Sequence, residues 1–264
     1  MLFPTVTFAA FLLVVVPLNW LTMPRPSRWR GVMTVASYIF YAWWDPRFAL
    51  LLAGSTVFNQ VIAVRIAAAA GQTRKALLWL GIAGNLAVLL YFKYLNFFLE
   101  STQEVAGDLG IRLDPGFVSI VLPVGVSFFT FMALAYVIDV YRGDYEPVTL
   151  SRFALFLSFF PHLVAGPIVR VTEFAPQIRE PLGERLVLAV PAFQLIVFGL
   201  FKKVVISSYL ANEIADPVFA APGQYGSLEI LVGVYAYAIQ IFADFSGYTD
   251  IAIGCALLLG VKFP

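Results

Sequence analysis

The side chains that could carry chemistry in this chain are few, and its single histidine, His162, is the first of them. His162 lies in the stretch 159–170, which reads FFPHLVAGPIVR. An imidazole titrates near neutral pH, so His162 is a candidate for direct chemistry. The other interpretation is a structural histidine that hydrogen-bonds a neighbour where a helix is kinked.

Helix-breaking residues surround this histidine. Pro161 and Pro167 each remove a backbone donor and clash with the preceding turn, and Gly166 lies between them. Irregular backbone at membrane depth is tolerated only where it is buried in protein or lines a wet cavity. The stretch therefore predicts a bent or re-entrant element that faces a polar interior.

A second polar group lies in the stretch 240–250, which reads QIFADFSGYTD. Two carboxylates and three hydroxyl groups within seven positions are too polar for a lipid-facing surface, so we expect them to line a water-filled cavity or to bond other helices. Asp244 and Asp250 are six residues apart and do not share a face of one straight helix. This spacing does not support a paired-carboxylate mechanism of the glycosidase kind. The group consists of Asp244, Ser246, Tyr248, Thr249 and Asp250.

Two adjacent lysines, Lys202 and Lys203, interrupt another apolar stretch. Adjacent residues point about 100° apart on a helix, so at least one lysine could face the interior. There it could offer a positive charge to a carboxylate, a phosphate or a thioester carbonyl. An interfacial pair with extended side chains is the alternative interpretation. Asp139 is predicted to neutralise Arg142, three residues further along.

Other catalytic signatures are missing from the sequence. It contains no phosphate-binding glycine loop, no nucleophile elbow and no His/Glu spacing suited to a metal. The single cysteine, Cys255, lies in an apolar run and has no cysteine to pair with. We therefore expect neither a metal site nor a bound cofactor.

The composition indicates an integral membrane protein. Of the 264 residues, 61% are hydrophobic and only 12% are charged, and the mean hydropathy is +0.86. Soluble domains are about one quarter charged. A net charge of +1 without any basic block argues against a nucleic-acid partner. We expect one all-α membrane domain over residues 1–264, a polytopic helical bundle with the break near Pro161–Pro167.

About seven or eight apolar segments fit the roughly 20 residues that a span requires. Arg25, Arg28 and Arg30 follow the first segment, and Arg74 and Lys75 follow the third, so both loops are predicted to be cytoplasmic and the N-terminus outside. The final apolar run could be one tilted helix or two pieces. The expected apolar segments are 2–21, 32–44, 48–70, 76–99, 117–141, 150–165, 186–210 and 228–259, with an extramembrane stretch at 100–116, an amphipathic one at 171–185 and a polar loop at 212–227.

Five motifs in this order resemble the membrane-bound O-acyltransferase family, in particular its bacterial alginate O-acetylation and D-alanyl transfer branches. The resemblance runs through the whole chain. The motifs are FYAWWDPRF at 40–48, YFKYLNF at 91–97, LPVGVSFFTF at 122–131, FFPHLVAGPI at 159–168 and DFSGYTDIA at 244–252.

The resemblance implies a helical fold with a funnel through the bacterial inner membrane. An acyl group, expected to be acetyl, would pass from a cytoplasmic thioester, either acetyl-CoA or an acyl carrier protein, to hydroxyls of an extracytoplasmic polysaccharide such as alginate. Membrane lipid and periplasmic acetyltransferases are the further partners that it implies. The residues expected to line the substrate channel are His162, Gly166, Pro167, Lys202, Lys203, Asp244, Ser246, Tyr248 and Asp250.

The family's characteristic histidines come later, in a Trp-His and a Trp-His-Gly stretch, and this chain ends at Pro264 before either. His162 lies in a different motif and does not inherit their role. We therefore expect an N-terminal portion of such an enzyme, inactive on its own. The competing hypotheses are a transporter or channel-like protein, whose path the lysines and aspartates would line, and a non-catalytic scaffold.

Overall fold

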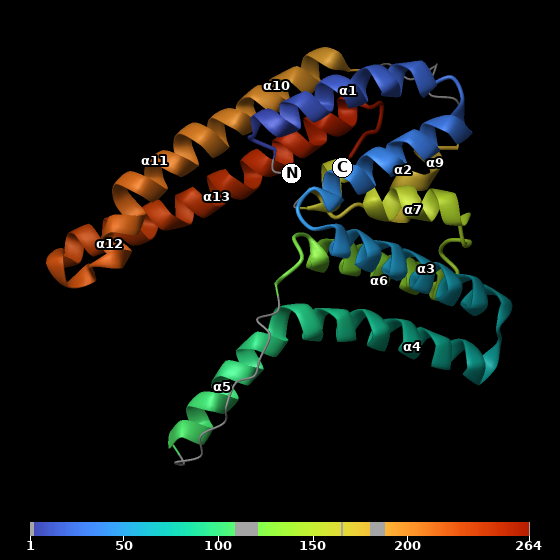
Figure 1. The fold of residues 1–264 in the computed structure, drawn as a ribbon, viewed down its shortest axis with the longest axis horizontal. Helices are drawn as coiled ribbons and strands as arrows, with labels where there is room; N and C mark the ends of the chain where they lie inside the picture. Colours follow the sequence, from blue (N-terminus) through green and yellow to red (C-terminus); the bar gives the residue numbers. More distant parts are fainter. Residues whose placement is uncertain (1–2, 109–120, 165, 180–187, 264) are drawn as a thin grey trace.

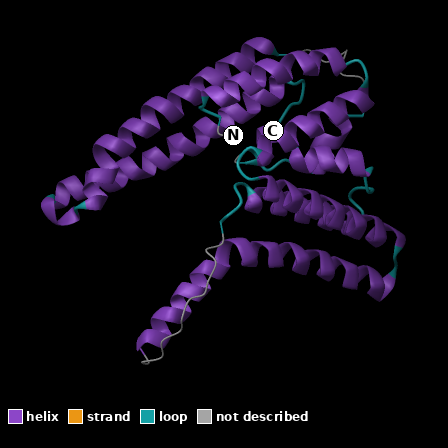
Figure 2. Ribbon diagram, viewed as in Figure 1, coloured by secondary structure: helices purple, strands orange, loops and turns teal. Residues whose placement is uncertain are grey.

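A computed structural model of the chain describes residues 3–108, 121–164, 166–179 and 188–263. Every regular element among them is helical, as Figure 2 shows. The predicted all-α class is therefore confirmed. The elements are α1 (Val6–Thr22), α2 (Pro26–Ala42), α3 (Pro46–Ala68), α4 (Gly71–Leu89), η1 (Leu90–Tyr94), α5 (Leu95–Asp108), α6 (Val126–Arg142), α7 (Leu150–Ser158), α8 (Phe160–Leu163), α9 (Val171–Gln177), α10 (Ala189–Leu200), η3 (Phe201–Ser207), α11 (Ser208–Leu210), η4 (Ala211–Ala215), α12 (Asp216–Ala220), η5 (Pro222–Gln224) and α13 (Ser227–Leu258).

The helices form two parts (Figure 1), which contact each other where α13 packs on α8, whereas α1 packs mainly on α2. One part, the body, stacks α2, α7, α3, α6 and α4 in successive layers. The other part is a long hairpin of residues 189–258, here called the arm, in which α10 to α12 run against α13. The body has an aromatic core, because large rings from α2, α6 and α7 are almost completely buried there. These include Trp29, Phe40, Phe129, Phe153 and Phe156.

Four helical stretches are long and apolar enough to cross a membrane. Their most apolar windows are only 11–39% buried within the protein, so most of their apolar surface faces outward. Contiguous apolar surface of this extent is not stable in water and is expected in lipid. The chain is therefore a multi-pass membrane protein. The four stretches are Pro46–Ala68, Gly71–Leu99, Ala189–Ala220 and Ser227–Leu258.

The arm differs from the expectation in one respect. The polar stretch 212–227 was predicted to be a loop, but the helical rod continues to Ala220 through η4 and α12. Two π-helical segments, η3 and η4, widen the rod along the way. Packing on α13 overrides the weak local preference of these residues, as tertiary contacts often do. The final apolar run is one helix of 32 residues rather than two pieces.

Two of the expected extramembrane stretches lie partly outside the described residues. The stretch 100–116 was expected to leave the membrane as a polar segment; α5 continues through its first part to Asp108, and the candidate span ends before it, at Leu99. Its remainder, from residue 109, is not described. In the amphipathic stretch 171–185, α9 accounts for the first seven residues, and residues 180–185 are not described.

The predicted break is present between α7 and α8, but the expectation that it faces a polar interior is wrong, because residues 159–163 are buried among aromatic side chains. Helix α7 ends at Ser158, and Phe159 has a non-helical backbone with φ −54° and ψ 108°. Pro161 occupies the first turn of the four-residue helix α8, where its missing donor costs nothing. The amide of Phe160 donates to the Ser37 hydroxyl at 3.1 Å, so the interrupted backbone finds a partner on α2.

Candidate functional site

His162 lies at the centre of an aromatic box. Its side chain is fully buried, and four phenylalanine rings lie 5.3–6.0 Å from the imidazole, centroid to centroid. Its Nε2 is 2.7 Å from the backbone carbonyl of Phe156, which can only accept a hydrogen bond. Nε2 therefore carries the proton, and Nδ1 has no partner among the described residues. The rings belong to Phe156, Phe159, Phe174 and Phe263.

This environment keeps the imidazole neutral. His162 lies outside the four candidate spans, and burial lowers its pKa to about 4, although the hydrogen bond to Phe156 opposes the shift. A general base must reach the proton that it abstracts. The box closes off Nδ1 from any substrate in this conformation, so the geometry supports the structural interpretation of His162.

Gly166 packs directly on the histidine. A Cβ atom at Gly166 would lie 2.5 Å from the His162 Cα, which leaves no room for a side chain. Its amide donates to the His162 carbonyl at 3.4 Å. Pro167 follows as a half-buried residue. The described contacts join Gly166 to His162, but they join neither residue to the lysines and aspartates.

Those lysines and aspartates meet where the two sides of the arm cross. Gly199 and Gly247 face each other, and a Cβ atom on Gly247 would lie 2.7 Å from the Gly199 carbonyl oxygen and 3.0 Å from the Lys203 amide nitrogen. Gly254 makes a similar approach to the Ala192 carbonyl at 2.7 Å. Small residues allow membrane helices to approach closely in this way. The backbone of η3 therefore rests on the backbone of α13 at Gly247.

Two ion pairs lie on either side of this contact. Lys202 Nζ is 2.6 Å from Asp250 Oδ2, and Lys203 Nζ is 2.5 Å from Asp244 Oδ1. The four side chains are 20–45% exposed, so the pairs are neither sealed in the core nor fully open. Ser207, one turn beyond Lys203, adds a 3.4 Å hydrogen bond to the same oxygen of Asp244. The lysines bind carboxylates, as one of the sequence interpretations required.

Two buried hydroxyl groups next to these pairs have no partner among the described residues. They are the Oγ of Ser246 and the phenolic oxygen of Tyr248. The Tyr248 ring stacks on Phe3 with centroids 4.3 Å apart, and Lys203 Nζ lies 5.8 Å from the same ring, within cation–π range. Buried hydroxyls normally have a hydrogen-bond partner, so these two are available to bond a water or a ligand.

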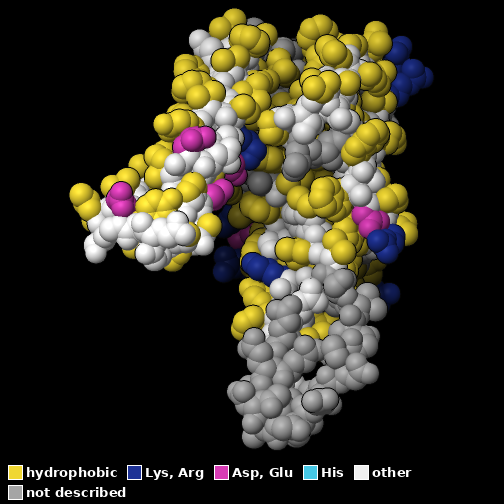
Figure 3. Space-filling view, turned by 60° about the vertical axis from the view of Figure 1, so that its left-hand side comes forward, with side chains coloured by type: hydrophobic (Ala, Val, Ile, Leu, Met, Phe, Trp, Pro, Cys, Tyr) yellow, Lys and Arg dark blue, Asp and Glu magenta, His cyan; other side chains and the backbone are white. Residues whose placement is uncertain are grey.

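Figure 3 shows the surroundings of the arm. Lysine, arginine, aspartate and glutamate side chains gather along the recess where the arm meets the body, whereas hydrophobic side chains dominate the outer faces visible in this view. This distribution is expected of a membrane protein whose charges face an interior surface.

The structure therefore splits the predicted site residues into two groups. Lys202, Lys203, Asp244 and Asp250 come together, with Ser246 and Tyr248 on the same helix, while His162, Gly166 and Pro167 belong to the α7–α9 region. Sequence reasoning missed Ser207 and Gly199. Ser207 lies four residues after Lys203 and could have been found from helical spacing, but nothing in the sequence marked Gly199.

One predicted ion pair is wrong. Asp139 was expected to pair with Arg142, but its Oδ1 lies 3.6 Å from Nη1 of Arg170. Asp139 is buried on α6, whereas the Arg170 side chain is 62% exposed. The long-range partner lies closer than the local one, because the chain that follows α8 returns over the end of α6.

Comparison with known proteins identifies relatives that are about twice as long. The chain is 42% identical over 245 residues, 90% of its length, to a probable alginate O-acetylase of Pseudomonas aeruginosa, of which it covers 46%. It is 33% identical over 267 residues to a peptidoglycan O-acetyltransferase of Helicobacter pylori, of which it covers 49%. A teichoic acid D-alanyltransferase of Streptococcus thermophilus is 28% identical over 176 residues, 64% of this chain and 42% of that protein.

No family model matches the sequence. The chain spans about half the length of the curated relatives that it matches. Their names all describe acyl transfer, and the similarity to the first of them extends over nine tenths of this chain. Relatives at 33–42% identity over this share of the residues show that the chain belongs to the membrane-bound O-acyltransferase family.

Proposed function

We propose that this chain is part of a membrane O-acyltransferase of the bacterial inner membrane. It would move an acyl group, acetyl in the simplest case, from a cytoplasmic thioester to hydroxyls of an extracytoplasmic polysaccharide such as alginate. The donor would be acetyl-CoA or an acyl carrier protein. The observation that carries the proposal is the 42% identity to a probable alginate O-acetylase over 90% of the chain.

The cluster on the arm supports a role next to the transferred group. A substrate ester or hydroxyl could bond the hydroxyls of Ser246 and Tyr248, which have no partner among the described residues, and the ring of Tyr248 lies beside the positive charge of Lys203. Charges and donors that are fixed before a reaction stabilise developing charge better than mobile ones. Lys203 is fixed by Asp244, and Lys202 by Asp250. We propose that the pairs hold η3 on α13 and that the hydroxyls face the passage.

His162 has no chemical step in this proposal. It supports the α7–α9 turn, and the family resemblance assigns the catalytic histidine to a later part of the protein. The basic loops after α1 and α3 would face the cytoplasm and the N-terminus the outside. Periplasmic acetyltransferases would be the partners that receive the acyl group in an alginate-type system.

The activity can be tested with the complete protein in inverted membrane vesicles. Isotopically labelled acetyl-CoA is supplied outside, and label is measured in alginate enclosed in the lumen, with unacetylated peptidoglycan as the comparison acceptor. Label in alginate that depends on the protein supports the proposal. Uptake of free acetate or another solute, with no label in either polymer, would favour a transporter instead.

The role of Tyr248 can be separated from its role in packing. Tyr248→Phe removes only the hydroxyl and keeps the stack on Phe3. If the hydroxyl contacts the substrate, transfer falls by about tenfold or more, because one lost hydrogen bond to a reacting group is worth at least that, while stability is unchanged or raised. Full activity of Tyr248→Phe would remove this hydroxyl from the proposed site. Phe3→Leu is the matched control, since it weakens the stack and leaves the hydroxyl in place.

A further inference from the structure

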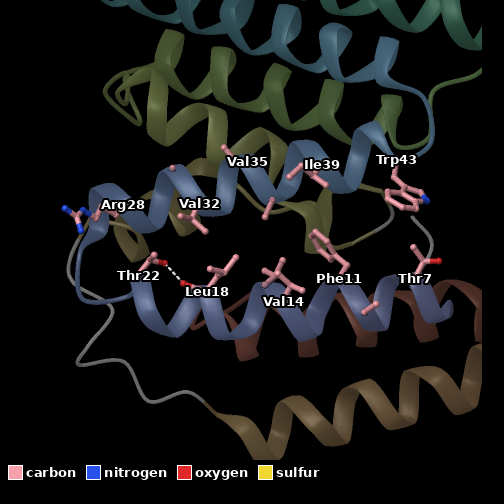
Figure 4. Close-up of a pocket in the computed structure, with 14 residues that line it drawn as sticks. Thr7, Phe11, Val14, Leu18, Thr22, Arg28, Val32, Val35, Ile39 and Trp43 are labelled. Carbon is pink, nitrogen blue, oxygen red and sulfur yellow. Dashed lines mark hydrogen bonds between the residues drawn. The ribbon is translucent and has the colours of Figure 1, made fainter.

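A long apolar groove runs between α1 and α2 (Figure 4). Its volume is about 850 Å³, and aliphatic and aromatic side chains of both helices form its walls. Arg28 lies at one end and Trp43 at the other. Inside the groove, the Thr22 hydroxyl is satisfied by the Leu18 carbonyl at 2.7 Å. The groove extends over about 15 residues of α1, roughly 22 Å at 1.5 Å per residue, which is more than half of the hydrocarbon thickness.

A second hollow of about 300 Å³ lies between α2 and α7 and adjoins the first. Gly31 and Val35 line both hollows. A Cβ atom at Gly31 would meet nothing within 4 Å, so the space around this residue is open. The smaller hollow has a larger polar share in its lining than the groove, although most of its lining is apolar as well. Its remaining lining residues are Ser27, Arg30, Thr34, Ser151 and Ala154.

Within the described ranges, no ion pair neutralises the positive charge at the small hollow. Arg30 lines it, and Arg152 is close enough for the two positive charges to oppose each other. The Nε atoms of both guanidinium groups are buried without a hydrogen-bond partner among the described residues. The only hydrogen bond described for either side chain joins Arg30 to the Ile178 carbonyl at 3.4 Å. No carboxylate lines the described part of the hollow.

The two helices that enclose this hollow add to its positive potential. Both α2 and α7 begin beside it, since Ser27 and Ser151 lie in their first turns. Neither N-terminus is capped by a side chain, because Arg25 and Thr149 make no capping hydrogen bond. Free amides and the positive ends of two helix dipoles therefore lie near two guanidinium groups. Paired arginines with free N–H donors favour phosphate.

We propose that an anionic phospholipid occupies both hollows at once. Its phosphate would lie between Arg30 and Arg152, and one acyl chain would cross Gly31 into the groove between α1 and α2. The adjacency of a cationic and an apolar hollow matches an amphiphile. A soluble phosphate would leave the groove empty, and an apolar helix in the groove would leave the two arginines unpaired.

The test uses the complete protein, purified in detergent and exchanged into nanodiscs that contain phosphatidylcholine with a small fraction of phosphatidylglycerol. Native mass spectrometry then counts the lipids that remain bound after release from the nanodisc. The wild type is expected to retain one phosphatidylglycerol. The double variant Arg30→Gln/Arg152→Gln is expected to bind it at least about tenfold more weakly, because charge-assisted hydrogen bonds to phosphate are lost. Arg65→Gln, at an exposed arginine of α3, is the control and should retain the lipid.

Two further variants decide whether the effect belongs to a lipid. Gly31→Leu adds a side chain to the opening, where its Cβ atom meets nothing within 4 Å, and should reduce lipid retention by a similar factor, whereas binding of soluble glycerol phosphate should be unaffected. Arg30→Lys/Arg152→Lys keeps the charge and should retain more lipid than the glutamine variant. The proposal is overturned if both double variants lose lipid equally, if Arg65→Gln loses as much, or if glycerol phosphate displaces the lipid at equal concentration.

Discussion

The contact between Gly199 and Gly247 yields a quantitative prediction. Replacing Gly247 by alanine places a Cβ atom 2.7 Å from the Gly199 carbonyl oxygen, whereas an ordinary contact begins at 3.4 Å. Both partners are backbone atoms, so no side chain can move aside. Helix α10 and η3 must therefore retreat from α13 by about 0.7 Å, the difference between those two distances.

The loss of folding free energy expected for Gly247→Ala is moderate and is the sum of three contributions. Forcing a methyl group into a closed contact costs about 1–3 kcal/mol. The same retreat lengthens both lysine–aspartate pairs, and partly exposed pairs contribute at most about 1 kcal/mol each. Alanine is the better helix former by about 1 kcal/mol, which offsets part of this loss. The net destabilisation of Gly247→Ala should be about 1–3 kcal/mol.

Gly54→Ala is the matched control. It makes the same chemical change in the middle of α3, where a Cβ atom would meet nothing within 4 Å, so it should be neutral or stabilising by up to about 1 kcal/mol. The two variants should then differ in stability by about 1–4 kcal/mol, with about 2 kcal/mol as a representative value.

The assay is the rate at which a thiol reagent modifies Cys255, which is fully buried on α13. The modified peptide is quantified by mass spectrometry on protein in detergent. A 2 kcal/mol difference corresponds to roughly 30-fold faster labelling in Gly247→Ala than in Gly54→Ala, since 1.4 kcal/mol is a factor of ten. Equal labelling rates in the two variants would refute the close-contact reasoning.

Three further predictions concern single side chains. His162→Phe keeps the aromatic packing but leaves a buried carbonyl unpaired, so thermal unfolding should show a loss of about 1–3 kcal/mol with no change in the pH profile of transfer. Asn59 and Asn85 exchange hydrogen bonds of 2.6 and 3.2 Å between α3 and α4, so Asn85→Leu alone should cost more stability than replacing both by leucine, measured as a double-mutant cycle. The hydrogen bond with Arg47 lowers the pKa of Asp45, so the cap that Asp45 gives α3 should persist through the ordinary aspartate range and be lost only as pH falls below it. The measurement is the protection of the Arg47 amide against hydrogen exchange, relative to its intrinsic rate at each pH, and a loss of protection within the ordinary aspartate range would contradict this prediction.

Much of the fold could be predicted because a membrane imposes simple rules. Apolar runs of about 20 residues predict spans, and the runs 48–70 and 228–259 match α3 and α13 within about two residues at each end. The break shortly before Pro161 could be predicted because proline is excluded from a helix interior and tolerated in a first turn. These features depend on local chemistry, which the sequence contains in full.

Features that depend on distant partners could not be predicted. Arg170 lies beside Asp139 only because the chain returns over α6 after its break, and the local partner Arg142 was the natural expectation. The sequence around η4 predicts a loop, but in the structure these residues are helical because they pack on α13. Arg30 and Arg152 are close enough to influence each other electrostatically, but they are more than a hundred residues apart in the sequence, and neither stands out alone. In each case, tertiary packing decides which local possibility is realised.

The spacing of Asp244 and Asp250 is a further feature whose role becomes clear only from their distant partners, Lys202 and Lys203. Asp244 and Asp250 do not share a face of α13, as their separation of six residues requires, and this excluded a joint carboxylate mechanism. The same spacing is what the structure needs, because adjacent lysines point in different directions and diverge around Gly247. Each lysine therefore reaches one aspartate, and a pair of aspartates on a single face could not bind both. The packing of η3 on α13 thus depends jointly on a glycine at 247 and on aspartates on either side of it that pair with the two lysines. Exchanging Lys203 with Asp244 should preserve this packing, whereas reversing either charge alone should weaken it.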